Sequence, residues 1–268
     1  MLVCLVSKTW RKLAQEVFEN RLNETDDYGL TPFAIACRSG HTFVVKIILN
    51  SPEGKRNTLS YLNRSSSVVH ICDEKRSPFM FACEYGDEDI VKLLLDYSTK
   101  DEIYFNVKEN EGRNAFMLAC QKRQVKVVKM LLDYSPRKDI NLETIDTREM
   151  TPLMLAIENE HYEVFRLLLD HAERKDVDHD LFKHNAFTLA CTLGQTEMVK
   201  ALLDHPQSIK LQINEIGNGT TLFMYGFLAA TRHSQVDVVS SIFYFITIRP
   251  KLSTGMPGME RLDLVPFF

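Results

Sequence analysis

Cysteine is the residue type in this chain whose repetition could indicate metal binding or disulfide formation. The chain has six cysteines, and four of them directly follow an alanine: Cys37, Cys83, Cys120 and Cys191. No CxxC pair is present and no histidines cluster with them, whereas zinc sites need closely spaced ligands. A cysteine at one fixed place in a repeated phrase is typical of a small buried apolar residue. We therefore predict four core thiols, no metal site and no cofactor.

Motifs of catalytic sites are missing from the sequence. It has no glycine-rich phosphate loop, no GxSxG and no HExxH. The adjacent His179 and Asp180 are expected in a loop between structural units and not in a catalytic pair. Asp87, Glu88 and Asp89 are expected at the start of a helix, where carboxylates interact favourably with the helix dipole. These observations predict a protein that is not an enzyme.

The charge balance argues against nucleic-acid binding. The 268 residues include 32 Lys and Arg against 36 Asp and Glu, a net charge of −4, so there is no basic excess to neutralise phosphates. No segment reaches the roughly 18 apolar residues of a membrane span, and the start, MLVCLVSKTW, has no signal-peptide cleavage site. We therefore expect a monomer in the cytoplasm, with the nucleus as the alternative compartment, and no membrane association.

The sequence contains an internal repeat. FMFACEYGDEDIVKLLLDYS begins at Phe79, and FMLACQKRQVKVVKMLLDYS begins 37 residues later (116 − 79), at Phe116. Aligning the apolar residue three places before the alanine gives six units, 34 to 46 residues apart, anchored at Phe33, Phe79, Phe116, Leu153, Phe187 and Leu222. Such a period indicates stacked structural units.

Each unit has the pattern of two short helices joined by a turn. In the first unit Thr31 is a helix-capping residue, Pro32 suits the first helical turn, and Gly40 ends the first helix. The following residues place Phe43, Val44, Ile47 and Ile48 on one helical face. A pair of helices this short cannot bury both faces alone, so the units must stack. The polar segments between units are predicted to be short hairpin loops.

The first unit resembles an ankyrin repeat. The family pattern is Asp-x-x-Gly-x-Thr-Pro-Leu-His-x-Ala, then Gly-His, then Val-Val. The matching residues are Asp26, Gly29, Thr31, Pro32, Ala36, Gly40, His41, Val44 and Val45, and in the fourth unit Asp146, Thr151, Pro152, Ala156 and His161. Five clear units and a degenerate sixth extend over residues 26–246. The resemblance implies an all-α fold, an α-solenoid of stacked ankyrin helix-turn-helix repeats with short β-hairpin loops.

The chain departs from the family pattern in two ways. The His that ties neighbouring repeats together in the family is replaced by Ala34, Met80, Met117, Met154 and Thr188, so its hydrogen bonds are not expected. Asn-Ala replaces Thr-Pro at 114–115 and at 185–186. The asparagines can still cap their helices, but the preset backbone angle of proline is lost, and softer junctions are expected there.

The resemblance further implies that a partner protein, which the sequence does not identify, binds the concave side through hairpin tips and exposed positions of the first helix of each repeat. These positions vary between units, and several are aromatic or apolar, as at interface hot spots. The alternative is that some of them fill space against neighbouring hairpins. The candidates are Tyr28, Leu30, Arg38, Glu84, Tyr85, Arg113, Gln121, Lys122, Arg148, Met150, Glu158, Asn159, Phe182 and Leu193.

Residues 1–22 are predicted to form an amphipathic helix, because Leu5, Val6, Trp10, Leu13 and Val17 recur at helical spacing. One interpretation is a cap over the first repeat, which solenoids require. The alternative is that CLVSKTWRKLA resembles the last helix of an F-box, with Leu5, Val6, Trp10 and Leu13 at the matching positions. That resemblance implies docking to the adaptor of a cullin-type ubiquitin ligase, with the chain as a substrate-recognition subunit that has a truncated F-box.

Residues 249–268 are predicted to be a flexible tail, because Pro250, Gly255, Pro257 and Gly258 interrupt the helical pattern. The preceding segment, 236–248, is apolar on more than one face. Either the apolar residues of the tail fold back over it or a partner covers it.

Overall fold

The computed structural model describes residues 24–51, 76–97, 107–134, 142–175, 180–204 and 222–248. These residues form α-helices and no β-strand, in agreement with the all-α prediction. The chain divides into two compact units at Pro152 and Leu153, which are treated separately below. The predicted N-terminal helix (1–22) and C-terminal tail (249–268) lie outside the described residues.

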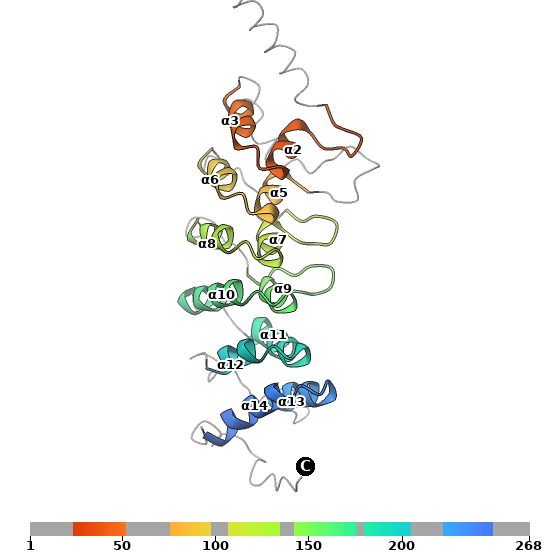
Figure 1. The fold of residues 1–268 in the computed structure, drawn as a ribbon, viewed down its shortest axis with the longest axis vertical. Coiled ribbons are helices and arrows are strands. Elements are labelled where there is room, and N and C mark those ends of the chain that lie inside the picture. The colour runs from red at the N-terminus through yellow and green to blue at the C-terminus, as the bar shows by residue number, and fades with distance from the viewer. Residues whose placement is uncertain are drawn as a thin grey trace, which may run out of the picture. The chain divides into compact units, whose positions relative to one another are not determined.

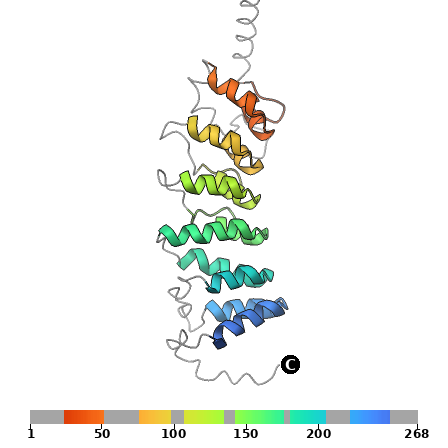
Figure 2. The same cartoon turned by 60° about the vertical axis from the view of Figure 1, so that its left-hand side comes forward.

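The described residues of the first unit include three pairs of helices in two layers. The inner helices are α2 (Pro32–Arg38), α5 (Pro78–Tyr85) and α7 (Ala115–Gln121), and the outer helices are α3 (Thr42–Asn50), α6 (Glu88–Tyr97) and α8 (Val125–Tyr134). Each inner helix packs on the next inner helix, and each outer helix packs on the next outer helix. Figures 1 and 2 show these pairs stacked in chain order.

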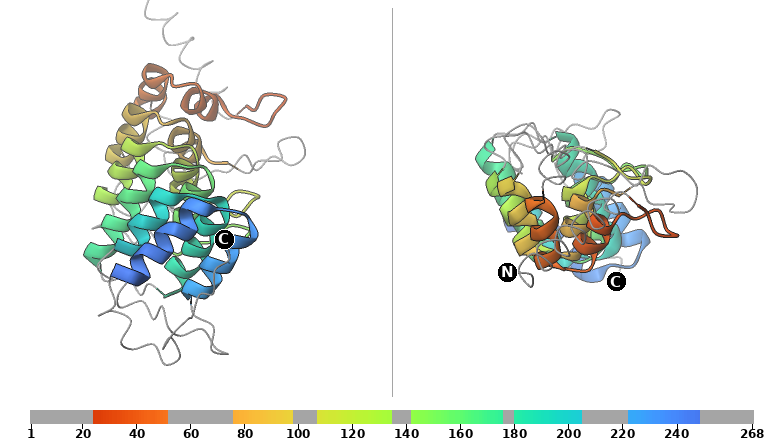
Figure 3. Two further views of the ribbon diagram at one scale, coloured as in Figure 1. Left: turned by 60° about the horizontal axis from the view of Figure 1, so that its bottom comes forward. Right: turned by 90° about the horizontal axis from the view of Figure 1, so that it is seen from above.

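The second unit repeats this plan. Its helices are α9 (Pro152–Glu158), α10 (Tyr162–Lys175), α11 (Asp180–Leu193), α12 (Thr196–Asp204), α13 (Leu222–Arg232) and α14 (Val236–Ile248). Helices α11 and α13 lie side by side, as do α12 and α14 (Figure 3). All six predicted repeats therefore contain a helix-turn-helix pair, including the degenerate sixth.

Polar side chains start the inner helices of the first unit. Thr31 Oγ1 and Ser77 Oγ each accept a hydrogen bond from a backbone N–H three residues on, both at 3.2 Å, and Asn114 Oδ1 does the same at 2.9 Å. Pro32 and Pro78 occupy the first helical turn, where their missing N–H has no role. The predicted caps at Thr31 and Asn114 are confirmed.

The predicted cap at Asn185 is wrong. Helix α11 begins at Asp180, so Asn185 lies inside it, and Asp180 belongs to the helix and not to a loop. The segment DLFKHNAF contains no glycine or proline that would stop the helix from extending towards the N-terminus.

One backbone position recurs in every repeat. The turn between the two helices has a residue with left-handed φ, which is Gly40, Gly86, Arg123, Glu160, Gly194 or Ser234. Phe187 lies seven residues before Gly194, and Phe227 lies seven residues before Ser234. The anchor of the sixth repeat is therefore Phe227, and the predicted anchor Leu222 is wrong because α13, like α11, begins early.

The core of the first five repeats is built around the anchor residue, whereas Phe227 of the sixth is half-buried. Phe33, Phe79, Phe116, Leu153 and Phe187 are all buried. Met80 and Met117, which stand where the family pattern has histidine, are buried as well. Phe81 of α5 packs against Leu30 and Ala34 of the preceding repeat. Apolar contacts therefore occupy the junctions where the family has a polar link.

A glycine-to-alanine change in one turn tests the backbone requirement. Gly86 has φ +77°, and a Cβ there would collide with the Gln124 amide. We expect Gly86→Ala to lower the free energy of unfolding by about 2 kcal/mol, because left-handed φ alone costs an L-residue roughly 1–2 kcal/mol. Urea denaturation followed by circular dichroism measures the change.

Glu160→Gly is the matched control. Glu160 occupies the equivalent turn position with φ 60° and is exposed, so this change should leave stability unchanged or raise it by up to about 1 kcal/mol. A comparable loss of stability in both variants would show that φ does not determine the residue type at this position.

Candidate functional site

Aspartate side chains shape the loops that precede α2 and α9. Asp26 Oδ1 accepts hydrogen bonds from the backbone N–H groups two and four residues on, at 3.0 and 2.8 Å. Asp146 Oδ1 does the same, at 2.8 Å for both. Tyr28 at the first tip is 63% exposed, and the Arg148 side chain at the other is 49% exposed. Figure 3 shows the loop of residues 24–30 projecting from the helices.

The loops of residues 107–114 and 142–150 are tight turns closed by backbone hydrogen bonds, Glu109 N to Arg113 O at 2.9 Å and Asp146 N to Met150 O at 3.1 Å. They are also joined to each other. The Thr147 N–H donates to the Glu111 carbonyl at 2.9 Å. These contacts hold the two tips in fixed positions within the first unit.

Buried ion pairs lie beneath this surface. Arg76 and Glu84 form a 2.6 Å ion pair in which each side chain is less than 10% exposed. Lys122 Nζ lies 3.9 Å from Glu84. In the next repeat the Arg113 side chain binds Glu109 at 2.9 Å and Gln121 at 2.8 Å. Glu84 and Arg113 therefore act within the framework and are not presented to solvent.

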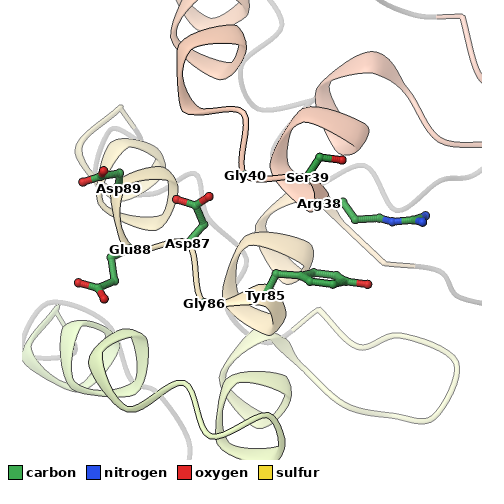
Figure 4. Close-up of a pocket in the computed structure, with 8 residues that line it drawn as sticks. All are labelled: Arg38, Ser39, Gly40, Tyr85, Gly86, Asp87, Glu88 and Asp89. Carbon is green, nitrogen blue, oxygen red and sulfur yellow. The ribbon is translucent and has the colours of Figure 1, made fainter.

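A surface pocket of about 600 Å³ lies between the first two turns of the array (Figure 4). Its lining comes from Arg38 to Gly40 on one repeat and Tyr85 to Asp89 on the next. The Arg38 and Tyr85 side chains extend to the same side, and Glu88 and Asp89 extend to the other. Helix α6 begins at Glu88, which confirms the prediction that the acidic residues start a helix.

The residue that follows the left-handed turn position covers the turn of the preceding repeat. At the next junction Gln124 covers Gly86 and donates through Nε2 to the Glu84 carbonyl at 2.9 Å. Gln235 covers Gly194 in the same manner. Asp87 holds this position at the first junction, and its carboxylate likewise lies over the turn, against Gly40. A carboxylate has no N–H, so it cannot donate to a backbone carbonyl as Gln124 does.

The structure supports only part of the predicted set of exposed residues. The exposed members are Tyr28, Arg38, Tyr85, Lys122, Arg148, Glu158 and Leu193, and the half-buried members are Gln121 and Asn159. Phe182 lies in α11, and its side chain is outside the described part of the structure.

Four predicted contact residues are buried, so the prediction that they are exposed is wrong: Leu30, Glu84, Arg113 and Met150. Leu30, Arg113 and Met150 directly precede a helix-capping position, and this position faces the stack. Leu30, for example, packs in the core with Ala34 and Phe81. Glu84 is drawn inward by Arg76.

Sequence reasoning missed Arg76, Glu109 and Gln124, which order the surface from below. The sequence signal for these side-chain pairs was a spacing of eight residues, which separates Arg76 from Glu84 and Arg113 from Gln121. In each case it joins the residue before the cap to the last turn of the same inner helix.

The four repeated cysteines are buried and unpaired, as predicted. Burial raises the pKa of each thiol, to about 12 for Cys191, and the nearby Asp87 charge adds to the effect of burial on the Cys37 pKa. Among the described residues no group of three His, Cys, Asp or Glu side chains could hold a metal ion. No helix in these segments has the length and apolar character needed to cross a bilayer.

Comparison with known proteins gives a consistent result. The family model described as ankyrin repeats (3 copies) matches residues 2–103, 53–144, 101–178 and 134–215. The chain is also similar to the ankyrin repeat domain of Bcl-3, described as a unique member of the IkappaB protein family. The TM-score is 0.60 and the sequence identity 21%, over 83% of this chain and 87% of that one. No curated protein sequence matches the chain significantly.

Two adjacent residues of α5, Glu84 and Tyr85, test which side chains stabilise the fold and which lie on its surface. We expect Glu84→Ala to lower the free energy of unfolding by about 3–5 kcal/mol, because the buried Arg76 guanidinium would lose its carboxylate. Tyr85→Ala should change it by no more than about 0.5 kcal/mol, because the ring is 56% exposed. Urea unfolding measures both. A large loss of stability for Tyr85→Ala would contradict the assignment of its ring to the surface.

Proposed function

Because the chain belongs to the ankyrin repeat family, whose members bind other proteins, we propose that it is a non-catalytic scaffold for a partner protein. The contact surface in the first unit is the hairpin face, defined here as Tyr28, Arg38, Tyr85, Lys122 and Arg148. The observation that carries the proposal is that two aromatic rings, Tyr28 and Tyr85, are more than half exposed on a tightly held framework. Tyrosine and arginine are the residue types enriched at binding hot spots.

The framework favours binding because it is already ordered. Asp26 and Asp146 fix the backbone of the tips, and the Arg76–Glu84 pair fixes the end of the helix that carries Tyr85. A surface that is held in place before association loses little conformational entropy when the partner binds. Rigid aromatic side chains on such a surface give contact area at low entropic cost.

The pocket beside Tyr85 gives the hairpin face a recess. It lies between two repeats, and Gly40 and Asp87 are among its lining residues. A side chain of the partner can enter it next to Arg38 and Tyr85, and contacts of this kind, in a recess near aromatic residues, dominate binding energy. In the second unit Glu158, Asn159, Phe182 and Leu193 are the proposed further contact positions.

Site-specific photo-crosslinking tests the proposal. A photoreactive amino acid at Tyr85 should crosslink the partner in cells, whereas the same group at Lys92, exposed on outer helix α6 of the same repeat, should not. With the identified partner, the Tyr85→Ala, Lys122→Ala double variant should bind at least about tenfold more weakly, a loss of about 1.4 kcal/mol.

Lys92→Ala is the matched control for affinity and should bind like the unchanged chain. Circular dichroism and urea unfolding establish that each variant is folded. Equal crosslinking from both positions, or unchanged affinity of the folded double variant, would place the contact surface elsewhere.

A second candidate function is substrate recognition in a cullin-type ubiquitin ligase. Its support is the F-box-like string with Leu5, Val6, Trp10 and Leu13. Purified ligase adaptor should then bind the chain in a pull-down, and Leu5→Ala with Leu13→Ala should abolish this binding while the hairpin face keeps its partner. Failure of the adaptor to bind at micromolar concentrations of both proteins would remove this candidate.

A further inference from the structure

The first repeat has an apolar surface on the side where a preceding repeat would lie. Phe81 of the second repeat packs against Leu30 and Ala34 of the first, so this position of an inner helix faces the preceding repeat. Phe81 is 4% exposed, and Leu118, at the same position in the third repeat, is fully buried. Ile35 holds the position in the first repeat and is 37% exposed. Its side chain faces the direction from which the other repeats receive a neighbour.

The outer helix of the first repeat also has an apolar residue that is less buried than its counterparts in the next repeats. Val44 is half-buried, whereas its counterparts Ile90 and Val127 are fully buried or nearly so. Phe43 is 75% exposed, and the position is held by the charged Asp89 in the second repeat.

The pattern of α3 extends this surface. Ile47 lies one turn after Phe43, on the same side of the helix, and is 42% exposed. We call Ile35, Phe43, Val44 and Ile47 the open face. Apolar residues at these positions are costly in water unless something covers them.

We propose that residues 1–22 of this chain cover the open face as a helix, with Trp10, Leu13 and Val17 directed at it. These three residues recur at i, i+3 and i+7 and share one side of a helix. The family model matches the chain from residue 2, so this segment matches the sequence of a repeat array. Ten helical residues, Thr9–Phe18 for example, would include all three and be about 15 Å long, comparable to α3.

The tether makes this segment the favoured occupant over a second copy of the chain. Only eight residues separate position 22 from Thr31, the cap of α2 (31 − 22 − 1). A segment joined by so short a linker has an effective concentration in the millimolar range, well above that of a free protein in solution. Packing on the open face would also engage Trp10 and Leu13, which the F-box-like interpretation assigns to the ligase adaptor, so the two contacts exclude each other.

Trp10 is a built-in reporter, because it is the single tryptophan of the chain. In the full chain we expect its fluorescence to be blue-shifted and protected from acrylamide relative to the urea-unfolded chain, at all protein concentrations. Ile35→Asp, at the position where Phe81 and Leu118 are buried in the next two repeats, should shift the emission to the red and remove most of the protection. Circular dichroism should show that the helices remain.

Val236→Asp is the matched control, since Val236 is 71% exposed at the start of an outer helix in the second unit; it should not alter Trp10 fluorescence. Should Ile35→Asp unfold the chain, amide hydrogen exchange provides the second measurement. Trp10→Ala should speed exchange in Thr42–Asn50 and leave Thr196–Asp204 unchanged.

Two results would overturn the proposal. One is a Trp10 spectrum in the folded chain equal to that of the unfolded chain, which would leave the segment available to the ligase adaptor. The other is protection that appears only at concentrations where sedimentation shows a dimer, which would assign the open face to a second copy.

Discussion

The stacking of one helix pair on the next is the interaction on which the rest of the structure depends. A pair such as α2 and α3 contains 7 and 9 residues, too few to form an independent core. Phe81 of the second repeat, for example, is buried against Leu30 and Ala34 of the first. Each junction must therefore match in shape, and an array end that lacks a neighbour exposes residues that are core residues elsewhere.

Polar contacts between repeats follow from this constraint. The family histidine is replaced by buried residues such as Met80 and Met117, and the polar link appears instead at the turn, where Gln124 reaches the Glu84 carbonyl. Asp87 holds that position at the first junction, where its carboxylate lies against Gly40 and cannot donate the same hydrogen bond. The same position therefore contacts the preceding repeat at both junctions, but only the glutamine supplies a donor.

The helix pairs, the caps at Thr31 and Asn114 and the buried cysteines were predictable from the sequence, because local capping chemistry and a repeated apolar pattern determine them. The early starts of α11 and α13 were not predictable from the sequence, because they depend on the absence of a stop signal and on tertiary packing. Among the candidate site residues, Tyr28 and Tyr85 are exposed as predicted, but Leu30, Glu84, Arg113 and Met150 are buried. Sequence position alone cannot show that an arginine such as Arg113 turns inward, because its partners Glu109 and Gln121 come from different parts of the repeat.

The aspartate-bound loops have a consequence for how such a protein evolves. Asp26 and Asp146 each accept hydrogen bonds from two main-chain N–H groups of their loop. At the second tip the half-exposed Arg148 side chain also lies 3.5 Å from Asp146, whereas at the first tip Asp26 binds the Tyr28 backbone. A tyrosine occupies one tip and an arginine the other, on the same backbone plan. Substitutions of an exposed tip residue such as Tyr28 can therefore be sampled with little folding penalty, and such a loop can acquire a new binding preference without changes in its neighbours.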